Sequence, residues 1–241
     1  MSMFFSGVWY YLNLAWVKFL LFFITTREIT GLENVPKRGA VIVVSNHLNN
    51  ADPPILTASI PRRLFWLTKI EWFSTPVVGR MFSMAKMIPV RRFEADLKAL
   101  RMCEKITKQG HALGMFPEGH RSDTGGLITA EPGTALIALR TGAPVLPVAI
   151  WGTEKVKLPR DLIGRTHAHI RIGKPFRLAR KEKVTREEIA GATDTIMKAI
   201  AALLPEKYRG VYGEPGASRL GATPQSPDPQ PLSRGRESGD K

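Results

Sequence analysis

Residues 40–53 read AVIVVSNHLNNADP, and this stretch decides the fold class. Its first six residues, 40–45, are rich in β-branched side chains, which predicts a short buried strand. The polar residues that follow stand at the carboxyl end of that strand. Residues 53–59 then predict a short helix, because proline suits the first turn of a helix. A strand that leads through a polar loop into a helix is typical of an α/β protein.

The same alternation continues along the chain, with no internal repeat. We predict further strands over 64–68, 87–90, 112–116, 145–151 and 168–172, and helices over 94–109, 133–141 and 185–204. Gly110 and Gly142 would end two of these helices, and Thr185 with Glu188 resembles a capping box at the start of the third. We therefore expect an α/β fold: a single layered domain with a mixed sheet flanked by helices.

The 241 residues suit one such domain with appendages at both ends. Residues 27–209 carry the alternating pattern. From residue 210 glycine, proline and serine dominate, which predicts a flexible tail over 210–241. The one cysteine, Cys103, excludes an intrachain disulfide, and we interpret it as a small apolar filler.

The apolar start of the chain predicts a membrane-associated helix over residues 1–26. Residues 4–24 read FFSGVWYYLNLAWVKFLLFFI, with nine aromatic residues and a single charge, Lys18. The run is long enough to span a bilayer, but its tryptophans and tyrosines fit a helix lying in the interface equally well. A buried core helix is a further alternative. A cleaved signal peptide fits less well, because no basic region precedes the run and no small-residue cleavage site follows it.

The positive charge is concentrated in the middle of the chain. The formal net charge is +14, of which +1 lies in residues 1–26 and +1 in 209–241, so residues 27–208 carry 14 − 1 − 1 = +12. Such a block favours an anionic partner: a phosphate substrate, an acidic lipid, an acidic carrier protein or nucleic acid. We expect no nucleic acid, because the chain has no nucleic-acid motif and its aromatic residues do not alternate with basic ones.

The first candidate site is the loop after strand 40–45. His47 follows the carboxyl end of the strand, where α/β proteins place their ligands, and Asp52 comes five residues later. A loop of this length can fold back so that the carboxylate meets the imidazole, which would set the tautomer of a general base. The acceptor hydroxyl of a substrate would take the place of a triad serine. The alternative is a helix-capping aspartate beside an unrelated histidine.

Three other blocks could carry chemistry. Residues 116–122, FPEGHRS, follow strand 112–116: Gly119 permits a tight turn, Arg121 offers a bidentate fork to phosphate, and Glu118 could orient that arginine or a substrate hydroxyl. The alternative is a surface turn with a weak ion pair. Residues 86–92, KMIPVRR, end in two arginines. Residues 143–150, APVLPVAI, could line an acyl groove, although a core strand is the simpler interpretation.

Together the four blocks resemble the glycerolipid acyltransferase family, typified by 1-acyl-glycerol-3-phosphate acyltransferase. The match runs from about Val41 to Ile150 and keeps the order and spacing of the family's blocks. The His-x-x-x-x-Asp block spans His47 to Asp52, the second block spans 88–92, the Phe-Pro-Glu-Gly-x-Arg-Ser block is intact at 116–122, and the proline-containing strand lies at 144–150.

The resemblance implies a role for each residue. His47 would be the general base and Asp52 its orienting partner. The acceptor and its phosphate would be bound by Arg92, Glu118, Gly119 and Arg121, and Lys69 stands where such enzymes often carry a basic residue. The family needs no metal or cofactor and uses acyl-CoA or acyl-carrier-protein as co-substrate. Its fold is expected to be glycerol-3-phosphate acyltransferase-like, and thioester donors place the protein at a membrane on the cytoplasmic face.

The resemblance leaves the acceptor open, because three positions depart from the family pattern. They are Lys86, where glycine is usual, Asn49, often serine, and His120, usually threonine. We expect 1-acyl-glycerol-3-phosphate as acceptor, giving phosphatidate in phospholipid biosynthesis, with another lysophospholipid or a glycolipid precursor as the alternative.

Two other classes of function compete with acyl transfer. A metal hydrolase could use His47, Asp52, Glu118 and His120, although their spacing is unusual for metal ligands. A non-catalytic, basic membrane-binding protein would explain the charge and the apolar start, but not the ordered blocks.

Overall fold

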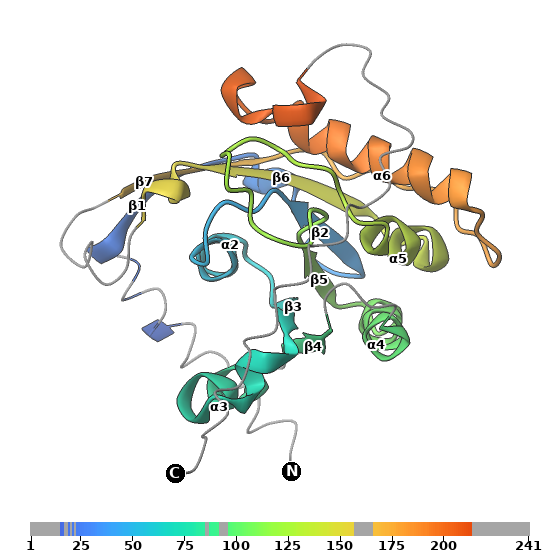
Figure 1. Ribbon diagram of the computed structural model, residues 1–241, viewed down its shortest axis with the longest axis horizontal. Helices are drawn as coiled ribbons and strands as arrows, with labels where there is room; N and C mark the ends of the chain where they lie inside the picture. Colours follow the sequence, from blue (N-terminus) through green and yellow to red (C-terminus); the bar gives the residue numbers. More distant parts are fainter. Residues whose placement is uncertain are drawn as a thin grey trace, which may run out of the picture.

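A computed structural model of the chain describes residues 23–84, 87–91, 96–156 and 166–213, together with residues 15, 16, 19 and 21. The described residues form one seven-stranded sheet in the order β1-β7-β6-β2-β5-β3-β4 (Figure 1). The strands are β1 (Thr25–Thr30), β2 (Val41–Ser45), β3 (Leu64–Lys69), β4 (Ile88–Val90), β5 (Ala112–Met115), β6 (Val145–Trp151) and β7 (Thr166–Ile172). Neighbouring strands are parallel except β6 and β7, so the predicted mixed sheet is confirmed.

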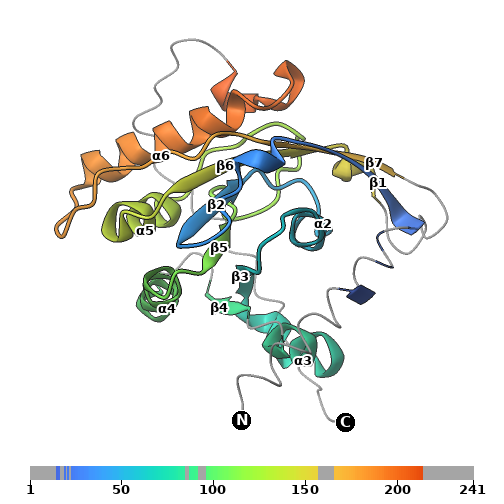
Figure 2. The ribbon, with the colours of Figure 1, turned by 180° about the vertical axis from the view of Figure 1, so that it is seen from behind.

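The helices cover both faces of this sheet. They are α2 (Asp52–Ser59), α3 (Pro76–Met84), α4 (Leu97–Lys108), α5 (Gly133–Thr141) and α6 (Arg186–Ala201). α4, α5 and α6 pack on one face and α2 on the other, while α3 lies at the β3–β4 end (Figures 1 and 2). Four predicted helices are confirmed, including the capping box of Thr185 and Glu188. Helix α3 was not expected, because its glycine and two valines lower helix propensity.

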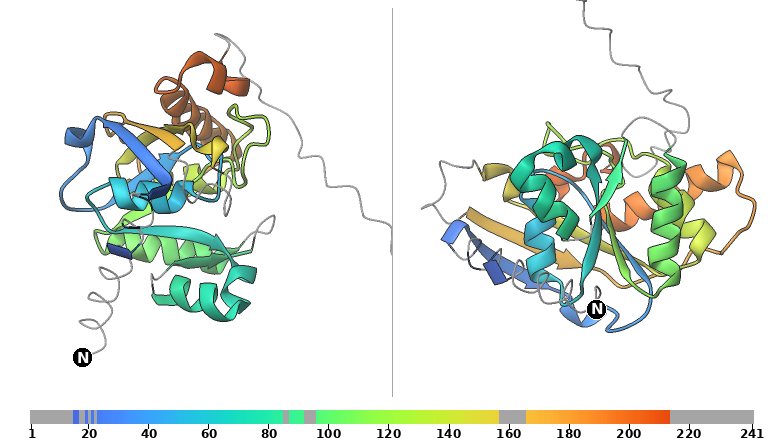
Figure 3. Two further views of the ribbon diagram at one scale, coloured as in Figure 1. Left: turned by 90° about the vertical axis from the view of Figure 1, so that its left-hand side faces the viewer. Right: turned by 90° about the horizontal axis from the view of Figure 1, so that it is seen from below.

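The core therefore lies in two layers, one on each side of the sheet. Figure 3 shows the sheet and its helices from two further directions. Alternate residues of β2 pack into the two layers: Ile42 and Val44 face α4–α6, whereas Val41 and Val43 face α2. All five residues of β2 are buried, as expected for a central parallel strand. Residues 145–150 in β6 are also buried, which confirms the core-strand interpretation. Cys103 is buried on α4, and burial raises the pKa of its thiol to about 12.

The ends of the fold differ from the predicted divisions. β1 starts at Thr25 and pairs with β7, so the sheet begins two residues before the predicted domain, 27–209. A short 3-10 turn, η5 (Gly210–Tyr212), lies within the predicted tail, 210–241, and the tail beyond residue 213 lies outside the described residues. Most of the predicted helix 1–26 is also outside them. Within the described part of the chain, no helix is both long and apolar enough to cross a bilayer.

The fold brings the predicted blocks to one edge of the sheet. β2, β5, β3 and β4 run in the same direction, so their carboxyl ends meet at the same edge. The loop 46–51 leaves this edge from β2, and residues 116–131 leave it from β5. The geometry of these two loops decides the candidate site.

Candidate active site

His47 and Asp52 form the predicted pair. His47 Nδ1 lies 2.9 Å from Asp52 Oδ2, and both side chains are buried. The contact forms because the loop after β2 turns back and α2 starts at Asp52. A carboxylate that accepts from Nδ1 leaves Nε2 as the imidazole nitrogen able to accept a proton.

Asp52 also accepts hydrogen bonds from the backbone of the loop that carries His47. The same Oδ2 accepts hydrogen bonds from the backbone N–H groups of Leu48 and Asn49, each at 2.7 Å. Asp52 stands in the first turn of α2, where the helix dipole favours a negative charge. Three donors on one oxygen fix the carboxylate relative to the ring, so Asp52 both orients His47 and holds its loop.

Glu118 reaches the same loop from β5. Its Oε1 accepts from the backbone N–H of His47 at 2.8 Å, and its Oε2 accepts from the N–H of Ile128 at 3.2 Å. The side chain is only 1% exposed, and desolvation raises the pKa of its carboxyl to about 7. Glu118 therefore bonds to the backbone of the base, a contact that its expected role toward an arginine or a substrate hydroxyl did not include.

The His47 backbone is held on its other side as well. Its carbonyl oxygen accepts from the N–H of Ser122 at 2.8 Å. The loop after β5 thus holds both the N–H and the carbonyl of the residue that carries the imidazole.

A stack of aromatic rings supports the imidazole. The His47 ring lies 4.0 Å from the ring of Phe116 at an angle of 16°, and Phe116 stacks on Trp66 at 4.9 Å and 15°. Trp66 can lie over β5 because Gly114 has no side chain: a Cβ there would be 2.6 Å from the indole. Sequence reasoning missed Trp66 and Gly114, because a strand pattern does not show which residues face each other across strands.

Two asparagines fasten the β2 loop to its neighbours. Asn46 exchanges two hydrogen bonds with the backbone of Ile150, at 2.7 and 2.9 Å, which extends the β2–β6 pairing by a side chain. Asn49, one of the departures from the family pattern, donates to the carbonyl of Val156 at 3.0 Å and accepts from the N–H of Ala51. In this chain Asn49 therefore supports the loop.

The remaining predicted binding residues lie at the same edge or outside the described residues. Gly119 turns the chain with φ +72°, and Arg121 two residues later is exposed. Lys69 ends β3, and its Nζ lies 3.4 Å from Glu71 Oε1 at the surface. Arg92 and Lys86 fall outside the described residues. The structure thus brings His47, Asp52 and Glu118 into contact, and places Gly119, Arg121 and Lys69 at the same edge of the sheet.

The same geometry bears on the metal hydrolase, the alternative in which His47, Asp52, Glu118 and His120 would bind a metal ion. His120 is exposed and its Nδ1 lies 3.0 Å from the carbonyl of Arg121. Among the residues that the structure describes, no group of three or more His, Cys, Asp or Glu side chains could hold a metal ion.

The fold and the site define an α/β protein with a buried histidine–aspartate pair at the carboxyl edge of a mostly parallel sheet. The chain belongs to the acyltransferase family, which it matches over residues 26–151, more than half of its length. It is similar in structure to the 1-acyl-sn-glycerophosphate (LPA) acyltransferase PlsC from Thermotoga maritima, with a TM-score of 0.62, 25% identity and 79% of each chain covered.

Curated relatives share less of their length. A chloroplastic 1-acyl-sn-glycerol-3-phosphate acyltransferase of Brassica napus is 33% identical over 144 residues, 58% of this chain and 42% of the relative. The enzyme of that name from Borreliella burgdorferi is 31% identical over 132 residues, 52% of this chain and 51% of the relative. The chain thus spans about half the length of these relatives.

Proposed function

We propose that this protein transfers an acyl group from acyl-CoA or acyl-carrier-protein to the free hydroxyl of 1-acyl-glycerol-3-phosphate, giving phosphatidate for phospholipid synthesis. The observation that carries the proposal is the 2.9 Å contact between His47 Nδ1 and Asp52 Oδ2 in a buried loop. The family to which the chain belongs and the names of its relatives support the choice of reaction and acceptor.

The geometry suits direct attack by the acceptor hydroxyl. The hydroxyl proton passes to His47 Nε2 while the oxygen attacks the thioester carbonyl. Asp52 accepts from Nδ1–H and stabilises the imidazolium. The C–S bond then breaks, the thiolate takes a proton from Nε2, and an ester and a free thiol result. Base catalysis of this kind contributes typically about 10²–10⁴-fold, and positioning of the two substrates contributes more.

The acceptor phosphate would bind beside this pair. Arg121 is exposed in the turn after Gly119, and Lys69, which is half-buried, ends β3 at the same edge. Arg92 completes the proposed phosphate site. A planar guanidinium can hold two phosphate oxygens, which fits an acceptor recognised by its charge and its geometry.

One assay tests the proposal on the purified chain of 241 residues. Acyl-CoA and acyl-carrier-protein are offered in turn with 1-acyl-glycerol-3-phosphate, other lysophospholipids and a glycolipid precursor. We expect phosphatidate formation that His47→Ala lowers by about 10²–10⁴-fold. The control is His111→Ala, because His111 is an exposed histidine at the opposite edge, directly before β5. Transfer by His47→Ala at the parent rate would refute the catalytic proposal, and transfer to another acceptor alone would refute the substrate.

We further propose that the protein works at the cytoplasmic face of a membrane. Trp16, Phe19 and Phe23 form an exposed aromatic cluster, each about half exposed, with ring centroids 5.9 and 5.1 Å apart. Leu21 and Ile24 of the same segment are buried in the core. Aromatic rings favour the membrane interface, and each basic residue near an anionic surface adds about 1 kcal/mol of attraction.

The buried residues of this segment decide how to test attachment. Deleting residues 1–26 would remove Leu21 and Ile24 from the core, so substitution is the sharper experiment. The triple variant Trp16→Gln, Phe19→Gln, Phe23→Gln should bind anionic vesicles less than the parent, whereas Leu32→Gln, at another exposed apolar residue, should bind normally. Salt should weaken the residual binding, because charges are screened over about 10 Å at 0.1 M. Unchanged vesicle binding by the triple variant would refute this anchor.

A further inference from the structure

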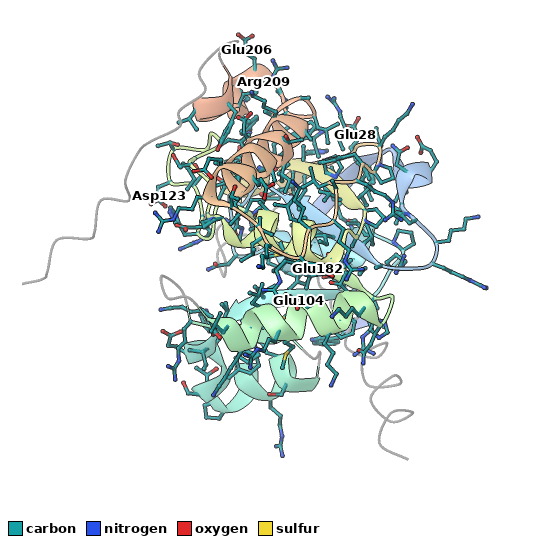
Figure 4. All side chains as sticks on the ribbon, turned by 90° about the vertical axis from the view of Figure 1, so that its right-hand side faces the viewer. Glu28, Glu104, Asp123, Glu182, Glu206 and Arg209 are labelled. Carbon is teal, nitrogen blue, oxygen red and sulfur yellow. The ribbon has the colours of Figure 1, made fainter. Side chains whose placement is uncertain are left out.

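The loop that holds His47 is itself bonded to the end of the described chain. We call residues 116–131 the site loop and residues 205–213 the C-terminal turn, which contains η4 (Glu206–Tyr208) and η5 (Gly210–Tyr212). In Figure 1 the green site loop between β5 and α5 reaches the red turn that follows α6. Figure 4 labels Glu206 and Arg209 on the turn and Asp123 on the site loop. The turn lies beyond residues 26–151, which carry the family match.

Leu127 joins the two segments through its main chain. Its N–H donates to the carbonyl of Tyr208 at 3.0 Å, and its own carbonyl accepts from the N–H of Val211 at 3.0 Å. The next residue, Ile128, donates its N–H to Glu118, which holds the N–H of His47. The turn is therefore connected to the backbone of His47 in three steps: the turn bonds to Leu127, its neighbour Ile128 bonds to Glu118, and Glu118 bonds to the N–H of His47.

The approach between the two segments is tight and excludes side chains. A Cβ at Gly126 would lie 2.9 Å from Gly210 Cα, and a Cβ at Gly210 would lie 2.0 Å from the carbonyl oxygen of Leu127. Gly210 also has φ +50°, which other residues rarely adopt. The contact thus depends on glycine at both positions.

The turn is anchored independently of the site loop. The Tyr208 hydroxyl donates to Glu154 Oε1 at 2.7 Å, and Arg209 Nε donates to the carbonyl of Leu204 at 3.1 Å. Tyr208 and Leu127 are both buried in the layer that α6 covers. A turn fixed to α6 and to residue 154 can hold Leu127 in place.

We propose that the C-terminal turn is a positioning element for His47, acting through Leu127, Ile128 and Glu118. This inference rests on the proposed function, since it assigns the turn to the same base. If a rigid link sets where Nε2 lies, loosening the turn lowers kcat and leaves binding of the acyl donor intact. The acceptor KM rises as well, because Gly119 and Arg121 of the proposed phosphate site lie in the same site loop. A displacement of about 1 Å at a reacting group can lower a rate by roughly 10²-fold.

Gly210→Ala tests the proposal in the full chain, with Gly191→Ala as its control. Gly191 is exposed on α6, and a Cβ there would meet nothing within 4 Å. We expect kcat for phosphatidate formation to fall about 10- to 100-fold in Gly210→Ala, with the donor KM within about twofold of the parent and the acceptor KM raised by a smaller factor than the fall in kcat. Gly191→Ala should match the parent in kcat and in both KM values.

A second pair of variants covers the case in which Gly210→Ala does not fold. Val211→Pro removes the N–H group that donates to the carbonyl of Leu127, whereas Val211→Ala keeps it. Because Val211 is exposed, both changes lose little packing. Val211→Pro should lower kcat in the same way, and Val211→Ala should not. Melting curves establish that each variant is folded at the assay temperature.

Amide hydrogen exchange tests the proposal without an activity assay. In Val211→Pro, and in Gly210→Ala if folded, amides of peptides 45–52 and 116–131 should exchange faster, whereas those of 145–151 in β6 should not change. Faster exchange confined to 205–213, or an unchanged kcat in folded Val211→Pro, would overturn the proposal. A parent chain that shows no acyl transfer refutes the proposed function instead, and the exchange pattern still decides whether the turn holds the His47 loop.

Discussion

The parent chain should lose about 3 kcal/mol of its free energy of unfolding as the pH rises from about 4.5 to about 7. Replacing Glu118 by glutamine should remove this loss. Burial raises the pKa of the Glu118 carboxyl from 4.5 to about 7 in the folded protein. Between these values the unfolded chain has released the proton and the folded chain has kept it. The free energy of unfolding therefore falls by about 1.4 kcal/mol for each pH unit in this window, and the difference of about 2.5 between the two pKa values sets the total.

The glutamine variant isolates this contribution. Its side-chain carbonyl can still accept from the N–H of His47, but its NH₂ group faces the N–H of Ile128, so it loses one hydrogen bond, about 1 kcal/mol, at every pH. Urea unfolding at constant ionic strength, from pH 4.5 to 8, gives the difference between parent and variant. We expect the parent to change from about 1 kcal/mol more stable than the variant near pH 4.5 to about 2 kcal/mol less stable above pH 7, where the difference levels off.

Thermal melts check the same number. In a chain of this size about 1 kcal/mol corresponds to roughly 2–4 °C, so the Tm of the parent should fall by roughly 6–12 °C relative to the variant over this window. Glu33→Gln, at an exposed glutamate in the 3-10 turn Leu32–Asn34, is the control and should follow the parent throughout. A difference that stays constant with pH, or that grows in favour of the parent, would refute the reasoning from burial.

Three further predictions concern the site and the chain end. His47→Ala should lower kcat by about 10²–10⁴-fold without unfolding the protein, and Asp52→Asn should lower it by a comparable or smaller factor. Substantial turnover by the alanine variant, in steady-state assays with both substrates saturating, would contradict this. Arg121→Lys keeps the charge but loses the fork, so the acceptor KM should rise more than the donor KM, and an effect on the donor alone would remove Arg121 from the phosphate site. Deleting residues 216–241 should leave kcat unchanged and Tm within about 2–4 °C of the parent, since that composition cannot bury much apolar surface; a larger drop in the melting curve would show that this segment packs on the domain.

The sequence by itself determined the class of fold and the pair at the centre of the site. Strand and helix periods are local properties, so the β-branched run before His47 and the capping box at Thr185 were enough to place their elements. The step from His47 to Asp52 is also local, because five residues of loop suffice to close the contact.

Only the tertiary structure decided what surrounds that pair. Strand order sets which loops meet, and it places Glu118 against a residue 71 positions earlier in the chain. It also lays Trp66 over Gly114 and brings the C-terminal turn to Leu127. Such contacts depend on long-range pairing and packing, which leave no period in the sequence, so β1, the ring stack and the bond from Glu118 to the backbone of His47 could be found only in the folded chain.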